Sequence, residues 1–138
     1  MNLGTFILII CFGSYISVHG QHPVKVDTED VFIAVEQMPE YPGGIAELGK
    51  YLQKNIRLPQ NCLGEGKIIV GKFFISFVVT ETGGIRDIEV KPDYACPEQL
   101  ELLSEIVKDM PRWRPGLHGG KPVAVRYSLP MCIYPGYE

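Results

Sequence analysis

The chain has 138 residues, of which 46% are hydrophobic and 21% charged, and its formal net charge is −3. This length predicts one domain, and the composition is ordinary for a globular protein. A small negative net charge gives no general reason to expect nucleic acid or an anionic membrane surface as a partner, so neither is predicted.

The N-terminal end of the chain differs in character from the rest. Residues 3–18 are almost wholly apolar, and the first charged side chain is Lys25. This run is short for a membrane-spanning helix, which needs about 20 apolar residues. With Val18 and Gly20 at its end, it predicts a signal peptide over residues 1–20 that is cleaved after Gly20. The alternative is an uncleaved signal anchor, because no Lys or Arg precedes the apolar run. The chain is therefore expected to be exported, and to be held at a membrane only if residues 1–20 remain.

The four cysteines bear on the compartment and on the fold. Cys11 would leave with the signal peptide, and an odd number then remains, which predicts one disulfide and one free thiol. Cys62 precedes a predicted hairpin and Cys96 follows it, so their pairing is more plausible than either pairing with Cys132. Buried thiols that act as small hydrophobes are the alternative. No C-x-x-C or H-x-x-x-H spacing is present, and no metal site is expected.

In the first half of the mature chain, a polar and flexible leader over residues 21–30 precedes the elements. Residues 31–35 form a short β-prone stretch, and the MPEYPGG run at 38–44 breaks regular structure. A helix follows and ends before Pro59, because a residue before proline avoids the helical region. Its apolar face carries Ile45, Leu48, Leu52 and Ile56.

A hairpin is the strongest pattern in the middle of the chain. Residues 68–80 predict a strand, residues 81–84 a turn and residues 85–90 a returning strand with alternating side chains. One face of the first strand carries Phe73, Ile75, Phe77 and Val79.

The last third predicts a helix, a loop and a long strand. Pro97 opens the helix, Pro111 stops it, and residues 117–121 form a glycine-containing loop. Apolar residues alternate over 123–133, and Pro130 places that strand at a sheet edge, at least locally, since proline cannot donate to a ladder. The helix carries an apolar stripe of Leu100, Leu103, Val107 and Met110.

The order of these elements predicts an α+β fold. Two amphipathic helices would pack on one face of a three-stranded antiparallel sheet, with a short extra strand at the N-terminal end. The domain would cover residues 31–138.

Three segments in this order resemble the C-terminal domain of TonB, in the form common in Bacteroides-like bacteria. They are VEQMPEYPGG at 35–44, FFISFVVTETGGI at 73–85 and MPRWRPGLHGGKPVAVRYSLPM at 110–131. The resemblance covers residues 31–133. It implies a periplasmic module, active in TonB-dependent transmembrane transport, that grips the TonB box near the N-terminus of an outer-membrane transporter. The implied mode is β-augmentation, in which an extended peptide adds to an exposed sheet edge.

Two features depart from the family pattern. TonB proteins carry a long Pro-rich stretch before this domain, whereas residues 21–30 reach at most about 35 Å when extended. The family anchor also carries a Ser-x-x-x-His pattern that engages its motor, and neither Ser14 nor Ser17 has that spacing to His19. The chain is therefore expected to be a short free-standing domain that does not transduce energy on its own.

The resemblance and the predicted edge together indicate the binding residues. A possible groove or rim consists of Arg112, Trp113, Arg114 and Lys121. The favoured interpretation of Trp113, however, is a ring that fixes the chain, and that of the charges a solvated mixed-charge surface. Val125→Pro would test strand addition. A structural protein that dimerises through the same edge is the alternative function. The predicted edge strand comprises Val123, Ala124, Val125, Arg126, Tyr127, Ser128 and Leu129.

No catalytic residues are predicted, and neither is a cofactor. Ser104 and Ser128 have no His nearby in sequence, and a dyad of Cys96 with His118 is conceivable in space only. The Gly-Gly pairs lack the Lys-Ser/Thr of a phosphate-binding loop. The protein is not expected to be an enzyme.

Overall fold

The computed structural model describes residues 7–9, 25–26, 30–57, 59–62, 71–92 and 95–134. Within them the helices are α1 (Ile45–Asn55), α2 (Pro97–Lys108) and the short 3-10 helix η1 (Gln60–Cys62). The strands are β1 (Ile7–Ile9), β2 (Lys25–Val26), β3 (Val31–Phe32), β4 (Gly71–Val79), β5 (Ile85–Lys91), β6 (Gly116–His118), β7 (Lys121–Val123) and β8 (Val125–Tyr134).

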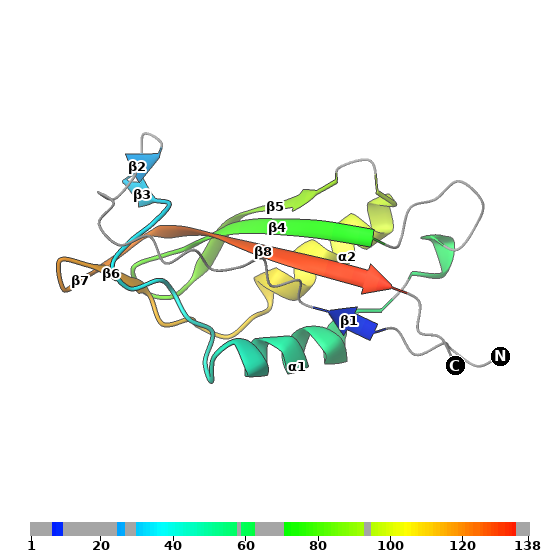
Figure 1. The fold of residues 1–138 in the computed structure, drawn as a ribbon. Coiled ribbons are helices and arrows are strands. Elements are labelled where there is room, and N and C mark those ends of the chain that lie inside the picture. Colours follow the sequence, from blue (N-terminus) through cyan, green and yellow to red (C-terminus); the bar gives the residue numbers. More distant parts are fainter. Residues whose placement is uncertain are drawn as a thin grey trace.

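The fold is α+β, and its centre is the expected antiparallel sheet of β8, β4 and β5. β4 pairs with β8 without interruption, from Gly71 opposite Ile133 to Val79 opposite Val125. The expectation of three strands is too small, because β3 lies parallel to β8, β2 extends β3, and β1 pairs with the other end of β8. Figure 1 shows β2 and β3 at one end of the long strands and β1 at the other.

Both helices cover one face of this sheet, as predicted. The PGG sequence starts α1, because Gly43 and Gly44 have φ of 85° and 84°, which glycine adopts without a steric penalty. The α1 residues Leu48 and Leu52 and the α2 residue Leu103 are buried in one core. They pack there with the predicted β4 face of Phe73, Ile75, Phe77 and Val79 and with Leu129, Met131 and Ile133 of β8. None of the described helices is long and apolar enough to cross a membrane.

The expected alternation of β5 is wrong, because the strand carries an irregularity. Ser76 of β4 lies opposite Glu89, yet Val78 lies opposite Arg86, so β5 holds one residue more than β4 in this interval. An extra residue reverses which face the following side chains meet. Ile85 and Ile88 consequently both pack against the core, although strict alternation would place them on opposite faces.

The segment before β8 also differs from expectation. The predicted loop at 117–121 is a small hairpin of β6 and β7, which turns at two glycines with positive φ. The predicted continuous strand over 123–133 is interrupted at Ala124, whose carbonyl accepts a hydrogen bond from the Phe32 N–H at 2.9 Å. The break between β7 and β8 therefore lies at the residue that contacts β3.

Two predictions on the N-terminal region stay predictions: the signal peptide over residues 1–20 and the leader over residues 21–30. β1 and β2 fall within the predicted signal peptide and leader, while the cleavage point after Gly20 lies outside the described residues. Ile7 to Ile9 lie opposite Tyr134 to Cys132, so β1 covers the last residues of β8 in the full chain.

Candidate functional site

On the side of β8 away from β4, the described strands pair only with its two ends. β3 meets that side at Val125 and β1 meets it from Cys132 onward. Among the described strands, none pairs with residues 126–131 on this side. We call this stretch the open side of β8.

The backbone groups that face the open side follow from the strand geometry. In a strand the N–H and C=O of one residue point to the same side, and successive residues alternate between sides. The Ala124 carbonyl points toward β3, because it accepts from Phe32. Residues 126, 128 and 130 therefore also face this side, whereas 125, 127 and 129 face β4. Ser128 offers both its N–H and its C=O there, and Pro130 offers only a carbonyl.

The predicted edge residues are thus split by the fold. Val123 belongs to β7 and pairs with Gly116, while Ala124 and Val125 are buried beside β3. The second half of the predicted edge, residues 126–129, lies on the open side. The reason is that β3 returns to the sheet where the sequence pattern alone indicates an unpaired strand.

The side chains of the open stretch divide between the two faces of the sheet. Leu129 is buried in the core and Tyr127 is half-buried against it. Arg126 and Ser128 lie on the opposite face, where the Arg126 guanidinium donates to Ser76 Oγ at 3.3 Å. The open side therefore has an apolar face toward the helices and a polar face away from them.

A hollow of about 280 Å³ lies beside Tyr127 on the helix face. The turn at residues 38–41, the start of α1, Trp113 and Tyr127 line it. Sequence analysis assigned no site role to Met38, Tyr41 or Ile45. The available signal was an apolar residue on each side of the PGG turn, although the helical pattern places Ile45 on the apolar face and the structure leaves it 41% exposed.

Trp113 belongs to the core and also to the wall of this hollow. It is 3% exposed, and its ring meets those of Tyr41, Phe77 and Tyr127 edge-on, with centroids 5.7, 5.3 and 4.9 Å away. Its indole N–H has no hydrogen-bond partner among the described residues. Both interpretations of this residue, as a structural anchor and as part of a groove, therefore rest on observed contacts.

Gly83 in the β4–β5 turn holds the backbone of Trp113 in place. The Trp113 N–H donates to the Gly83 carbonyl at 2.9 Å, and a side chain on Gly83 would meet the Trp113 carbonyl oxygen at 2.0 Å. Only a glycine at this turn permits that approach, and its φ of 83° is also one that favours glycine.

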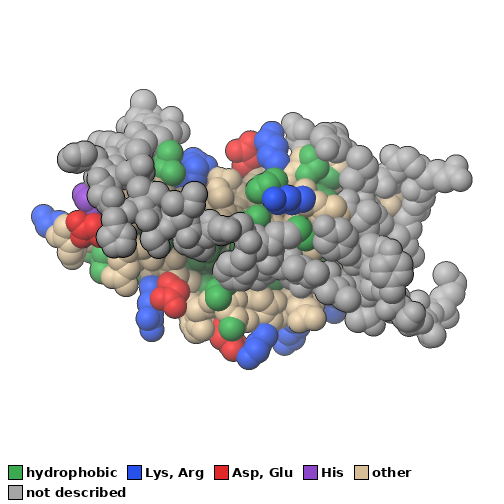
Figure 2. Space-filling model, viewed as in Figure 1, with side chains coloured by type: hydrophobic (Ala, Val, Ile, Leu, Met, Phe, Trp, Pro, Cys, Tyr) green, Lys and Arg blue, Asp and Glu red, His purple; other side chains and the backbone are tan. Residues whose placement is uncertain are grey.

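The expected basic rim is distributed over separate elements. The Arg112 guanidinium donates to the Thr82 carbonyl at 3.1 Å, and Arg114 lies 4.0 Å from the Glu40 carboxylate. Lys121 is exposed on the β6–β7 hairpin, and Arg126 lies on the face of the sheet away from the helices. Figure 2 shows acidic and basic side chains lying next to one another on the visible face, with hydrophobic ones between them. This arrangement favours the mixed-charge surface over a single basic rim.

The hydroxyls of Tyr41, which lines the hollow, and of Tyr51 stay protonated at physiological pH, because the pKa of each is raised. Burial, with a smaller contribution from the Glu47 carboxylate, raises the pKa of Tyr41 above its ordinary value of 10.0. Burial also raises the pKa of Tyr51, with help from Tyr41 and Asp109, and its hydroxyl donates to the Ile106 carbonyl at 2.8 Å. Among the described residues that line the hollow, Glu40 is the one charged side chain.

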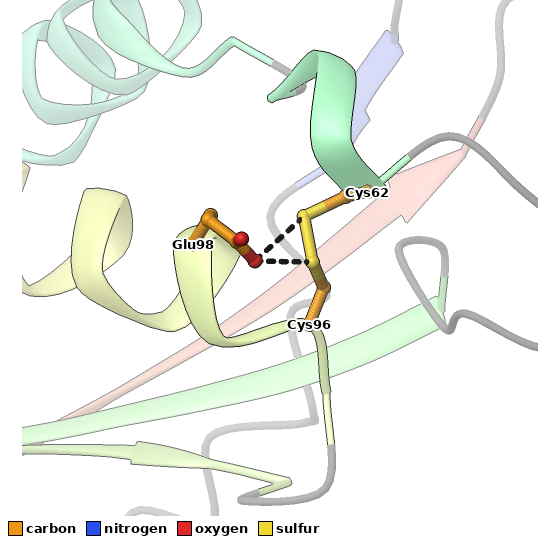
Figure 3. Close-up of side chains that lie close together, drawn as sticks. All are labelled: Cys62, Cys96 and Glu98. Atoms are coloured by element: carbon orange, nitrogen blue, oxygen red, sulfur yellow. Dashed lines mark hydrogen bonds between the residues drawn. A yellow bond between two sulfur atoms is a disulfide. The ribbon is translucent and has the colours of Figure 1, made fainter.

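The predicted Cys62–Cys96 disulfide is confirmed, with 5.8 Å between the two Cα atoms. In the full chain Cys132 is also disulfide-bonded, while the expected free thiol concerns the chain without residues 1–20 and stays a prediction. Figure 3 shows the Glu98 carboxylate directed at the Cys62–Cys96 bridge, 3.0 Å from Cys96 Sγ and 3.9 Å from Cys62 Sγ. Neither bonded sulfur carries a proton, so these are contacts with the bridge, and an S–H donor exists only after reduction.

The same bridge bears on metal binding and on the conceivable thiol dyad. Cys62, Cys96 and Glu98 are close enough together to share a metal ion, but the disulfide takes both thiolates out of the donor set. The Cys96 sulfur is likewise unavailable as a nucleophile. His118 contacts Glu36, at 3.8 Å, and the ring of Phe32.

Comparisons of this chain with protein-family models, with curated proteins and with solved structures gave no match. The resemblance to the TonB C-terminal domain therefore stays a prediction from the sequence motifs.

Proposed function

We propose that this protein is a periplasmic peptide-binding module of TonB type. It recognises N-terminal TonB-box segments of outer-membrane transporters by adding them as a strand to the open side of β8. The observation that supports the proposal is that no described strand pairs with β8 between β3 and β1 on the side away from β4.

The dimensions of the open side suit a short extended peptide. A strand rises about 3.3 Å per residue, so the five steps from 126 to 131 span roughly 17 Å. The Ser128 N–H and C=O and the carbonyls of Arg126 and Pro130 supply the hydrogen-bonding groups. Proteins usually blunt a strand edge with free backbone groups unless it is used, and in β8 Pro130 removes only one donor from this side.

Two further features support the compartment and the partner. Disulfides form and persist in oxidising compartments, so the Cys62–Cys96 bridge supports an exported protein. The choice of an outer-membrane transporter as the partner follows from the resemblance of residues 31–133 to the TonB domain.

The main-chain N–H of Ser128 is the group to test. Ser128→Pro removes this donor, whereas Ser128→Ala removes the same hydroxyl and keeps the N–H. In a titration with N-terminal peptides of the host's outer-membrane transporters, we expect Ser128→Ala to bind like wild type. We expect Ser128→Pro to bind at least about tenfold more weakly, because a ladder hydrogen bond is lost and the ring obstructs the incoming strand.

Amide hydrogen exchange locates the binding. A bound peptide should slow exchange at Ser128 and move NMR shifts mainly over residues 126–131. Equal binding by both variants, or shifts elsewhere on the domain, would count against strand addition here. Val125→Pro is not a suitable test, because the N–H of residue 125 faces β4 and its loss would break the sheet itself.

Self-association is a second candidate function, since the same open side can pair with a second copy of the chain. In that case the molecular mass in solution would rise with protein concentration. Ser128 exchange would slow without any peptide, and Ser128→Pro would restore the monomer.

A further inference from the structure

The Cys62–Cys96 bridge and the Glu98 carboxylate form a cluster of metal-ligating groups, which shares no residue with the open side of β8 or with the lining of the hollow. We propose that, once the bridge is reduced, Cys62, Cys96 and Glu98 bind a thiophilic divalent ion such as Zn²⁺. The ion then holds η1 against α2 in place of the disulfide. This proposal is independent of strand addition and describes a second state of the same junction.

The three side chains already lie at distances that suit a shared ion. Their ligand atoms all lie within 4.8 Å of one another. The Glu98 oxygen is 3.0 Å from Cys96 Sγ and 3.9 Å from Cys62 Sγ, and Figure 3 shows it directed at both sulfurs. Zn–S and Zn–O bonds of about 2.3 and 2.1 Å in a tetrahedral site place neighbouring donor atoms roughly 3.6 to 3.8 Å apart. The main rearrangement is therefore a separation of the two sulfurs once their covalent bond is broken.

The donor set determines the class of ion. Thiolates are soft ligands that favour zinc, whereas magnesium and calcium prefer oxygen ligands. Two thiolates and one carboxylate leave the fourth tetrahedral position to a water molecule. Cys62 and Cys96 are 0% and 4% exposed, whereas Glu98 is exposed, so the ion can approach the sulfurs from the side of the carboxylate.

The charges of the cluster explain why the thiolates need the ion. Two thiolates beside the Glu98 carboxylate would place three negative charges within 4.8 Å, which favours protonated thiols in the reduced chain without metal. A divalent ion offsets two of these charges. The N-terminus of α2, where Cys96 is the N-cap, favours the remaining negative charge.

Reduction of the bridge and binding of the ion are separate steps. A dithiol reductant transfers two electrons and two protons to the bridge, which becomes two thiols, while the reductant forms its own disulfide. Binding of the ion then releases both thiol protons. Oxidation of the two thiolates re-forms the bridge and expels the ion. The disulfide and the ion therefore exclude each other.

Co²⁺ is the probe for this site, because thiolate ligation gives it a charge-transfer absorption and Zn²⁺ displaces it. The full chain is titrated in its oxidised form and after reduction with a dithiol that is then removed without air. We expect the absorption in the reduced chain only. The Cys62→Ser, Cys96→Ser double variant should lack it, and Cys132→Ser should keep it. No absorption from the reduced chain, or equal absorption from the double variant, would overturn the proposal.

Glu98→Gln tests the third ligand, because it removes the carboxylate and keeps both cysteines. We expect it to bind Co²⁺ and Zn²⁺ at least about tenfold more weakly than wild type. Glu101→Gln removes a carboxylate at an exposed position of the same helix outside the cluster, and should bind like wild type. Equal affinities of the two variants would overturn the three-ligand site.

A stability measurement covers the case in which the reduced chain loses its fold. Zn²⁺ should raise the Tm of the reduced chain and leave that of the oxidised chain unchanged, because an ion that binds only the folded state stabilises that state. If Zn²⁺ leaves the Tm of the reduced chain unchanged, or raises that of the double serine variant equally, the ion does not hold η1 against α2 and the proposal is wrong.

Discussion

The two sides of β8 differ although they belong to the same strand. Toward β4 every residue from Val125 to Ile133 has a partner, and the side chains between the strands fill the core. Away from β4 the described strands pair only with its ends, β3 at one and β1 at the other. Strand propensity and apolar alternation predict that β8 is a strand with one buried face. Which neighbours pair with each of its two edges depends on the segments that return to it from elsewhere in the chain.

The largest expected difference comes from proline at adjacent positions of β8. Leu129→Pro removes an N–H that faces β4 and a buried side chain, so we expect a loss of at least about 4 kcal/mol in the free energy of unfolding. Ser128→Pro removes an N–H on the open side and should cost roughly 1 kcal/mol. Urea unfolding of both variants, with Leu129→Ala to separate the effect of burial, measures the contrast. Similar losses at 128 and 129 would show that the open side is paired after all.

A smaller loss is expected from the glycine that supports the hollow beside the open side. Gly83→Ala would force a Cβ to within 2.0 Å of the Trp113 carbonyl oxygen at a φ of 83°, so we expect a loss of about 3 kcal/mol. Gly120→Ala is the matched control, because φ there is 73° but no atom lies within 4 Å of the added Cβ. The control should lose only about 1 kcal/mol. Thermal unfolding, with Trp113 fluorescence as a second probe, distinguishes them, and equal losses would contradict the proposed contact.

Removal of residues 1–20 should lengthen the open side. β1 pairs with Cys132, Ile133 and Tyr134, and by alternation the backbone groups of 132 and 134 face it. Amides 132 and 134 should therefore exchange at least about tenfold faster in the 21–138 chain, since they lose their partners. Amides 131 and 133 face β4 and should be unaffected. If all four amides change together, the effect is a general loosening of β8.

The smallest effect is a dependence of stability on alkaline pH. The pKa of Tyr41 and of Tyr51 is raised in the folded protein, so in the unfolded chain both groups release their protons at lower pH. The unfolded state then binds fewer protons, and the free energy of unfolding should be unaffected below the ordinary pKa of 10.0 and fall as pH rises through and above it. Replacing both residues with Phe should reduce this decrease in the free energy of unfolding between neutral and alkaline pH. A decrease of unchanged size would show that other groups cause it.

Much of the fold could be predicted from local patterns. The alternation of Phe73, Ile75, Phe77 and Val79 identified the buried face of β4, and the stripes of α1 and α2 identified their buried faces. The Cys62–Cys96 pair followed from the position of these cysteines at the ends of one hairpin. Each of these predictions needed only neighbours along the chain or across one tight turn.

The errors concern contacts between distant segments. A single extra residue in β5 placed Ile85 and Ile88 on the same face, and no composition signal marks that bulge. The return of Phe32 to Ala124 closed half of the predicted edge. The hollow was missed for the same reason, because its walls come from the turn before α1, from the segment after α2 and from β8.

The sequence by itself determined the helices, the central hairpin, the Cys62–Cys96 bridge and the parity of β8, since side-chain periodicity and tight-turn geometry are local properties. The tertiary structure decided which described strands meet β8 on each side and where the hollow lies. Those features depend on loop closure and packing between segments up to about a hundred residues apart, such as Phe32 and Val125. Local propensity carries no information on such pairings.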